Sequence, residues 1–161
     1  MIKLGWLAPV RRVDAGTACS GILWQHGEIR AFLDRARSLA EAALDGVAPS
    51  ADAVASAIGD LHSTLEVHLT FEEKVLLPLL GNDPPVGPLR AARLQDDHAR
   101  QREMLAALHR EASAHPELPT LAAKLAFLTA WILADMDEEE ASLLNPDMIH
   151  DEAVSTDQSS R

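Results

Sequence analysis

Three short clusters of helix-breaking residues divide this chain into four long segments, and this spacing limits the folds that it can adopt. The clusters lie at about residues 45–49, 81–85 and 115–119, and each contains proline. A fourth break, Asn145-Pro146, follows the last segment. The four segments between the breaks span about residues 17–45, 51–80, 87–114 and 119–144. They are rich in Ala, Leu, Glu and Arg, which favour helix, so we expect four helices.

Short connections between long helices favour antiparallel neighbours, so we expect an all-α, up-down-up-down four-helix bundle. Apolar residues recur at the 3.6-residue period in each segment, as in helices that bury one face. A chain of 161 residues, 47 % of them hydrophobic, can bury such a core as a single domain. We assign residues 1–16 to an N-terminal arm, 17–146 to the bundle and 147–161 to a disordered polar tail.

Each of the four apolar faces is interrupted by residues that can bind metal ions. The first and third segments contribute one histidine each, and the second and fourth contribute a pair of residues spaced four apart. The six residues are His26, His68, Glu72, His98, Asp135 and Glu139. In an antiparallel bundle, the starts of the first and third helices adjoin the ends of the second and fourth. At 1.5 Å per residue, all six side chains then fall in a layer about 10 Å deep at one end of the core.

Such a layer would be costly without a cation. Buried carboxylates that lie close together repel one another and take up protons, whereas one or two divalent ions remove that cost. Imidazole and carboxylate together suit iron, manganese or zinc. Taken singly, His26 would more often be a hydrogen-bonded core residue, and His68 with Glu72 would more often be a solvated pair. Six such residues at one level favour a metal site, and we predict that all six are ligands.

The residues around these positions resemble the hemerythrin-like (HHE) cation-binding domain family. The resemblance covers about residues 17–146 and rests on ILWQHGEIRAFL around His26, HLTFEEKVLLPLL from His68, and DDHARQREMLAAL around His98. Its most specific part is the HxxxEE motif followed by LLP. The resemblance implies an up-down-up-down bundle with a non-haem di-iron site. It also implies a protein that carries oxygen, senses oxygen or iron, or responds to reactive oxygen or nitrogen species.

Two positions depart from the pattern of an oxygen carrier. DMDEEEASLLNP aligns with HLTFEEKVLLP, which places Glu139 at the position of Glu72 and Asp135 where the family usually has histidine. Arg102 stands where oxygen carriers have a second histidine, four residues after His98. We therefore expect a protein that senses or processes oxygen or reactive species, or handles iron, rather than a reversible carrier. Asp135 can still be a ligand; alternatively, Arg102 pairs with Asp135 or Glu139 in a metal-free or half-occupied site.

Other polar residues near the six are expected to lie outside the site. Glu73 and Glu140 each follow a proposed ligand directly and could accept hydrogen bonds from the ligands, but we favour a solvated face for both. His62 lies six residues before His68, about 120° around the helix, so we expect it to point outward. We also expect His109, in the third segment, to lie on the surface.

The overall charge limits the partners of this protein. The chain has 25 Asp and Glu against 14 Lys and Arg, a net charge of −11, which disfavours nucleic acids and anionic membranes. Cys19 is the only cysteine, so no intramolecular disulfide can form, and we expect a reducing, cytoplasmic location.

The resemblance implies iron, as one or two ions, with zinc or manganese as alternatives, and O₂, peroxide or NO as small ligands. The alternative function is that of a zinc-bound or metal-free bundle acting as an interaction or regulatory module. Neither catalytic turnover nor an oligomeric state is assigned by the sequence, because one site chemistry serves both binding proteins and enzymes.

Overall fold

Four helices contain nearly all of the residues that the structure describes. The computed structural model describes residues 15–47, 49–80, 85–114 and 117–144. The helices are α1 (Ala15–Leu44), α2 (Ala51–Leu80), α3 (Gly87–Ser113) and α4 (Leu118–Ser142). Each begins and ends within one turn of the segment that the sequence predicts, and no strand occurs among the described residues. The expected polar tail, and all but the last two residues of the expected N-terminal arm, lie outside the described residues.

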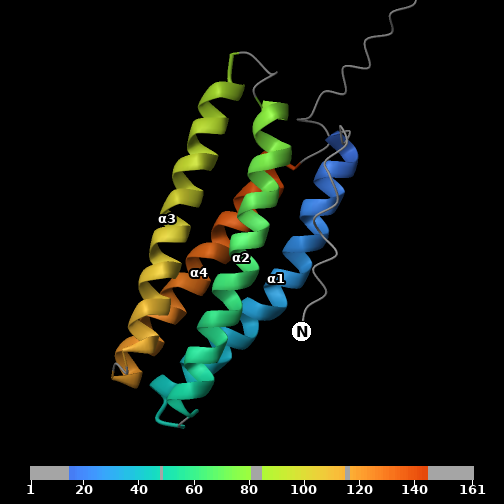
Figure 1. The fold of residues 1–161 in the computed structure, drawn as a ribbon. Helices are drawn as coiled ribbons and strands as arrows, with labels where there is room; N and C mark the ends of the chain where they lie inside the picture. The colour runs from blue at the N-terminus through green and yellow to red at the C-terminus, as the bar shows by residue number, and fades with distance from the viewer. Residues whose placement is uncertain (1–14, 48, 81–84, 115–116, 145–161) are drawn as a thin grey trace, which may run out of the picture.

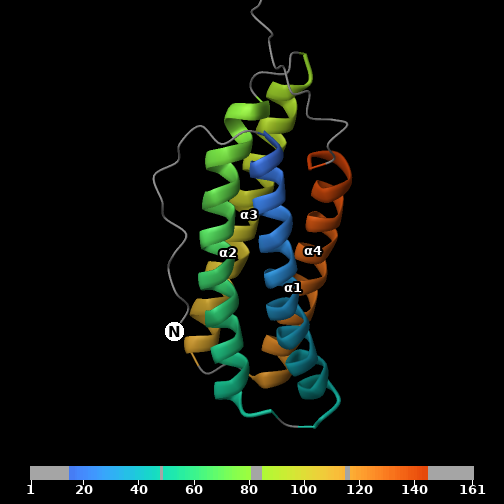
Figure 2. The same cartoon turned by 90° about the vertical axis from the view of Figure 1, so that its right-hand side faces the viewer.

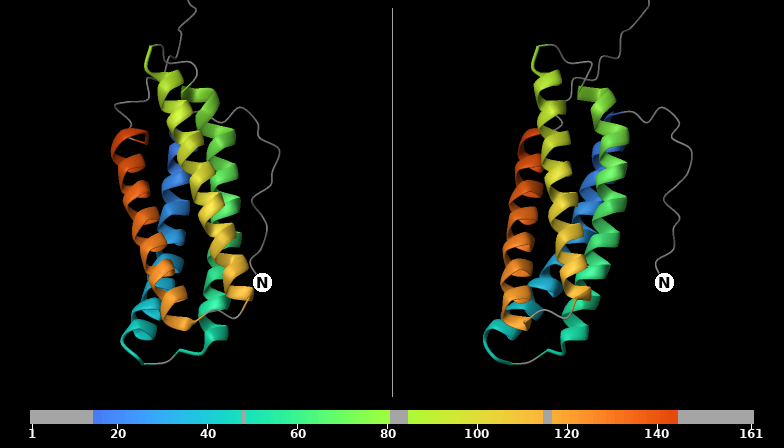
Figure 3. Two further views of the ribbon diagram at one scale, coloured as in Figure 1. Left: turned by 90° about the vertical axis from the view of Figure 1, so that its left-hand side faces the viewer. Right: turned by 60° about the vertical axis from the view of Figure 1, so that its left-hand side comes forward.

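The helices form an up-down-up-down bundle, which confirms the predicted fold (Figures 1 and 2). α1 packs against α2 and α4, and α3 packs against α2 and, less extensively, against α4. Figure 3 shows α3 between α4 and α2. The starts of α1 and α3 therefore share one end of the bundle with the last turns of α2 and α4.

Turn and capping residues stop the helices where the sequence predicts. Gly46 follows α1 with φ 73°, a left-handed conformation that glycine adopts without steric cost. Ser50 precedes α2, and its Oγ accepts a hydrogen bond from the backbone N–H of Ala53 at 3.1 Å. α3 and α4 each have a proline, Pro88 and Pro119, in the first turn, where a missing N–H costs nothing.

The apolar core has two parts. The main cluster draws on all four helices and includes Leu33, Leu65, Leu105 and Leu125. The end cluster lies at the end where α1 begins and consists of Ala18, Cys19, Ile22, Val75, Leu76, Leu94 and Leu144. Along every helix, a level of buried polar residues separates the two clusters.

By length and composition alone, α4 could also cross a membrane, since its mean hydropathy reaches 1.3. In this structure its residues Leu121, Leu125 and Leu128 are buried in the main cluster, and its Glu139 lies in the polar level. The core helix of a bundle passes the same hydropathy test, so this property of α4 is weak evidence for a membrane span.

Candidate metal centre

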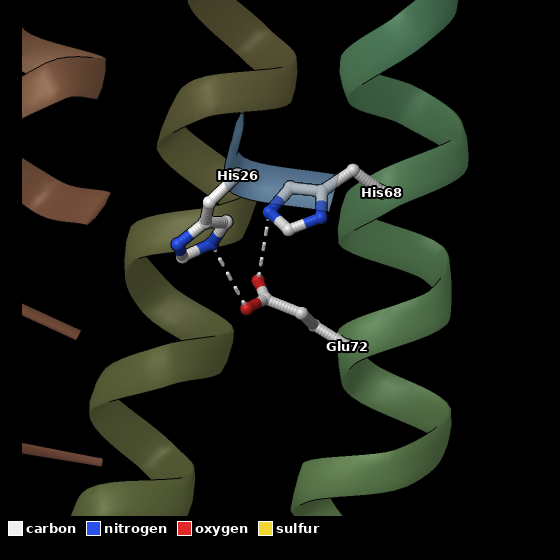
Figure 4. Close-up of side chains that lie close together, drawn as sticks. All are labelled: His26, His68 and Glu72. Atoms are coloured by element: carbon white, nitrogen blue, oxygen red, sulfur yellow. Dashed lines mark ion pairs between the residues drawn. The ribbon is translucent and has the colours of Figure 1, made fainter. Parts of the chain in front are cut away.

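Five of the six predicted residues meet in the buried polar level between the two clusters. α1 contributes His26, α2 contributes His68 and Glu72, α3 contributes His98, and α4 contributes Glu139. His26, Glu72 and His98 are fully buried, and the other two nearly so. Figure 4 shows the rings of His26 and His68 beside the carboxylate of Glu72. The antiparallel packing thus brings together residues that lie far apart in the sequence.

The Nε2 atoms of the three histidines face the two carboxylates. Glu72 Oε1 lies 3.5 Å from His26 Nε2, and Glu72 Oε2 lies 3.3 Å from the Nε2 atoms of both His68 and His98. The Glu139 carboxylate lies 3.7 Å from the Nε2 atoms of His26 and His98. These atoms form two groups, each with its donor atoms within 4.8 Å of one another: His26, His68 and Glu72, and Glu72, His98 and Glu139. Glu72 belongs to both groups.

These distances fit the ligands of a shared cation better than they fit hydrogen bonds. None is as short as a good N–H···O bond, which rarely exceeds about 3.2 Å. The Nε2 atoms of His26 and His98 and both oxygens of Glu72 are buried without a hydrogen-bond partner, which costs free energy if nothing binds them. Two ligand atoms about 2.1 Å from one ion, at a tetrahedral angle, lie roughly 3.4 Å apart. The residues present therefore fit a bound metal ion.

The sequence model of the hemerythrin HHE cation-binding domain matches residues 22–145, a range that contains both groups. The chain belongs to this family. Comparisons with curated proteins and with solved structures gave no significant match. The resemblance seen in the sequence is therefore confirmed, and with it a hemerythrin-like domain whose histidine and glutamate groups could bind a metal cation.

In this HHE domain, two of the histidines are also held through their other ring nitrogen. His26 Nδ1 lies 2.8 Å from Glu140 Oε1, and His98 Nδ1 lies 3.1 Å from Glu73 Oε1. An ionised carboxylate only accepts, so each Nδ1 carries a hydrogen and each Nε2 is the atom left for a metal. The favoured expectation of a solvated face for Glu73 and Glu140 is therefore wrong, and the alternative, that they accept hydrogen bonds from the ligands, is confirmed. Partial burial raises the pKa of each glutamate, but hydrogen bonds from arginine and histidine outweigh it, and both pKa values are lowered.

Two buried glutamines also contact the site, and sequence reasoning missed both. Gln25 Oε1 accepts a hydrogen bond from His68 Nδ1 at 2.9 Å, and the side chain of Gln101 donates to Asp135 Oδ2. Gln101 could have been found, because it continues the inward spacing of α3 three residues after His98. Gln25 could have been found in the same way, because it lies three residues after Ile22 and four before Ile29 on the buried face of α1.

Asp135 differs from the other five predicted ligands. It is only partly buried and belongs to neither group of donor atoms. Burial and the neighbouring charge of Asp97 raise its pKa above the usual value. The assignment of Asp135 as a ligand stays a prediction.

Arg102 pairs with neither Asp135 nor Glu139, so the alternative of a metal-free ion pair at this position is wrong. Its Nη1 donates to Glu73 Oε1 at 2.5 Å and its Nε to Glu66 Oε1 at 3.2 Å. Both acceptors lie on α2. The Arg102 side chain therefore extends from α3 toward α2 rather than toward α4. The position that is histidine in oxygen carriers therefore faces away from the donor atoms of this HHE domain.

Protons balance the charges of the site when no metal is bound. Burial lowers the pKa of His98, but the facing carboxylates of Glu139 and Glu72 outweigh it and raise the pKa to about 10. Burial dominates at His68 and lowers its pKa to about 4, and burial raises the pKa of Glu139 to about 7. Burial also opposes ionisation of Glu72, but the charge of His68 and the imidazoles of His26 and His98 lower its pKa to about 2. At neutral pH a Glu72 carboxylate therefore faces a His98 imidazolium.

A cavity of about 130 Å³ lies beside the site, between α3 and α4. Asp97 and Arg93 of α3 and Asp135 and Glu139 of α4 are among its lining residues. Arg93 also pairs with Glu138 of α4 at 2.5 Å. Because Glu139 belongs to one of the two donor groups, the cavity adjoins that group.

Proposed function

We propose that this HHE protein binds non-haem iron in the buried polar level and uses it to sense or process O₂, peroxide or NO, or to handle iron. The observation that carries the proposal is the convergence of three histidine Nε2 atoms on two carboxylates, at distances suited to shared ions. The proposed ligands are His26, His68, Glu72, His98, Asp135 and Glu139.

The donor set supports iron over the hard, oxygen-seeking cations. Three imidazoles and two carboxylates suit iron, manganese or zinc, whereas calcium and magnesium prefer oxygen alone. Each group offers three donors, which leaves coordination positions for other ligands. Iron bound there would supply a redox-active centre that a small oxidant can reach. Glu72 has one oxygen toward His26 and the other toward His68 and His98, so it is suited to link two ions.

The surroundings of the site support sensing or processing over reversible oxygen transport. Arg102 takes the place of a carrier's histidine and extends away from the donor atoms. Asp135 takes the place of another of the carrier's histidines and adds a carboxylate beside Glu139. The cavity between α3 and α4 is lined by both of these carboxylates and could hold a small molecule on this more anionic side.

Metal analysis of the purified protein tests this proposal. Protein purified without added metal should contain iron, and metal-free protein given Fe(II) and then air should take up to two ions per chain, one for each group. A new absorption band should appear with the uptake. His68→Ala should reduce iron uptake. The matched control is His62→Ala, because His62 lies on the same helix but stacks on His109 at 5.2 Å, outside both groups.

Other outcomes would redirect the proposal. Uptake of zinc but not iron would favour the interaction or regulatory module, and uptake of neither would favour a metal-free bundle. If the iron-loaded protein consumes added peroxide over many turnovers, it processes the oxidant; a single spectral change without turnover would indicate sensing.

A further inference from the structure

The two fully buried histidines of the site are held by the same three-residue arrangement, once on each side of the bundle. On one side, Glu140 Oε1 receives both His26 Nδ1 at 2.8 Å and Arg30 Nη1 at 2.7 Å. On the other side, the equivalent acceptor is Glu73 Oε1, which receives both His98 Nδ1 at 3.1 Å and Arg102 Nη1 at 2.5 Å. In both cases the arginine follows its histidine by four residues on the same helix, and the glutamate lies on the helix beside it.

Each arginine also contacts a second carboxylate, one turn or two away from the first. Arg30 Nη2 donates to Asp137 Oδ1 at 2.7 Å, and Arg102 Nε donates to Glu66 Oε1 at 3.2 Å. With the first contacts, they attach the guanidinium of Arg30 to α4 and that of Arg102 to α2, each at two points. The side chains of Arg102 and Glu73 are each 28 % exposed, whereas His98 is fully buried. Each arrangement therefore runs from the surface to the site.

The position of the glutamates explains why an arginine is needed. A glutamate that is about one-third exposed can turn its carboxylate to water, where it would no longer hold the imidazole. A guanidinium with two fixed contacts prevents that movement, because its planar donors match carboxylate geometry. Partners of this kind on the outer nitrogen of a metal-binding histidine fix the orientation of its ring.

We propose that Arg30 and Arg102 are positioning residues that hold Glu140 and Glu73 against the Nδ1–H groups of His26 and His98, and so direct both Nε2 atoms into the site. This inference rests on the proposed metal-binding function and gives Arg102 a role there. Arg102 is the counterpart of Arg30 on the opposite side of the bundle rather than the remnant of a lost ligand. His68 has no such arrangement, because the neutral amide of Gln25 accepts its Nδ1–H.

The two sides serve as controls for each other in a test by NMR. Exchange of the His26 and His98 Nδ1 protons with water is measured in ¹⁵N-labelled protein, both metal-free and loaded with zinc, which is diamagnetic. Arg102→Gln should speed exchange of the His98 proton by about tenfold or more and leave the His26 proton unchanged. Arg30→Gln should do the reverse. Arg37→Gln, which removes surface ion pairs with Asp34 and Glu41, should change neither proton.

Zinc affinity gives a second measurement. Each glutamine variant should weaken zinc binding by about tenfold, as is typical when the outer partner of a metal-binding histidine is removed. Arg102→Lys keeps the positive charge and should fall between wild type and Arg102→Gln in both measurements, a rescue that a general loss of packing would not give.

The positioning role is overturned if both protons respond alike to each variant, or if neither responds. If wild-type protein takes up no zinc or iron, the metal-binding function fails. The exchange rates in metal-free protein would then still decide whether the arginines hold the histidines.

Discussion

Glu72→Gln should cause the largest loss of metal binding of any single substitution in this protein. Glu72 is fully buried, belongs to both groups of donor atoms and faces three histidines. Loss of an outer partner typically costs 10- to 100-fold in metal affinity, so loss of this shared carboxylate should cost more than about 100-fold. Titration of metal-free protein with zinc or Fe(II) measures the change.

The same substitution should destabilise the metal-free protein. It removes one of the carboxylates that face the His98 imidazolium, while Glu139 and Glu73 stay beside it. Loss of one such charged contact should lower the free energy of unfolding by about 2 kcal/mol. Denaturant unfolding in the presence of a chelator measures this loss. Glu28→Gln is the matched control, because Glu28 lies on the exposed face of α1 and should change neither property. Unchanged metal affinity in Glu72→Gln would remove Glu72 from the ligand set.

The metal-free protein should lose stability steadily as the pH rises from about 7 to 10. Folding holds a proton on His98 up to a pKa of about 10, whereas the unfolded chain releases it near the ordinary value of 6.5. The resulting stabilisation is complete below pH 6.5 and is lost as the pH rises through 10. The slope should approach 1.4 kcal/mol per pH unit, the value for one proton released on unfolding. The pKa of His26 is also raised, which adds to the effect.

At acid pH the metal-free protein should lose stability as the pH falls rather than as it rises. Burial lowers the pKa of His68 to about 4, and that of Glu72 is lowered to about 2, so the stability that each contributes is lost as the pH falls. The pKa of Glu139, raised to about 7, acts against them between its ordinary value of 4.5 and pH 7. Denaturant unfolding with a chelator at a series of pH values measures the whole curve.

Two controls identify the source of the alkaline slope. His98→Gln should flatten it, because the proton responsible is gone. Zinc-loaded protein should also show a flatter curve, since a bound ion takes the place of the proton on Nε2. A slope that persists in His98→Gln would assign the lost stability to other groups.

Helical spacing predicted the fold and the level of the site because both follow from local sequence. His68 and Glu72 are four residues apart, which places them on one face of any helix, and the breakers on either side fix their distance from its end. The same reasoning brought His26, His98 and Glu139 to that level. No tertiary detail was needed for these five positions.

Residues at the edge of the buried face were predicted less well. Glu73 and Glu140 lie about 100° around the helix from the ligands that precede them, so sequence alone places them between core and solvent. Their role depends on whether the neighbouring helices place an arginine and a histidine next to them, and this is a tertiary property. The same limit applies to Arg102, whose direction toward α2 depends on how α3 is rotated in the bundle.

The separation of the core into two clusters has a consequence for how the protein would acquire its metal. The main cluster joins all four helices and contains none of the proposed ligands, so the chain can reach its fold before any ion arrives. The end cluster is small and is connected to the main cluster across the polar level. We expect zinc to slow amide exchange near Ile22 and Leu94 far more than near Leu33 and Leu105. Metal incorporation would then be a maturation step separate from folding, and the protein could be emptied and refilled without unfolding.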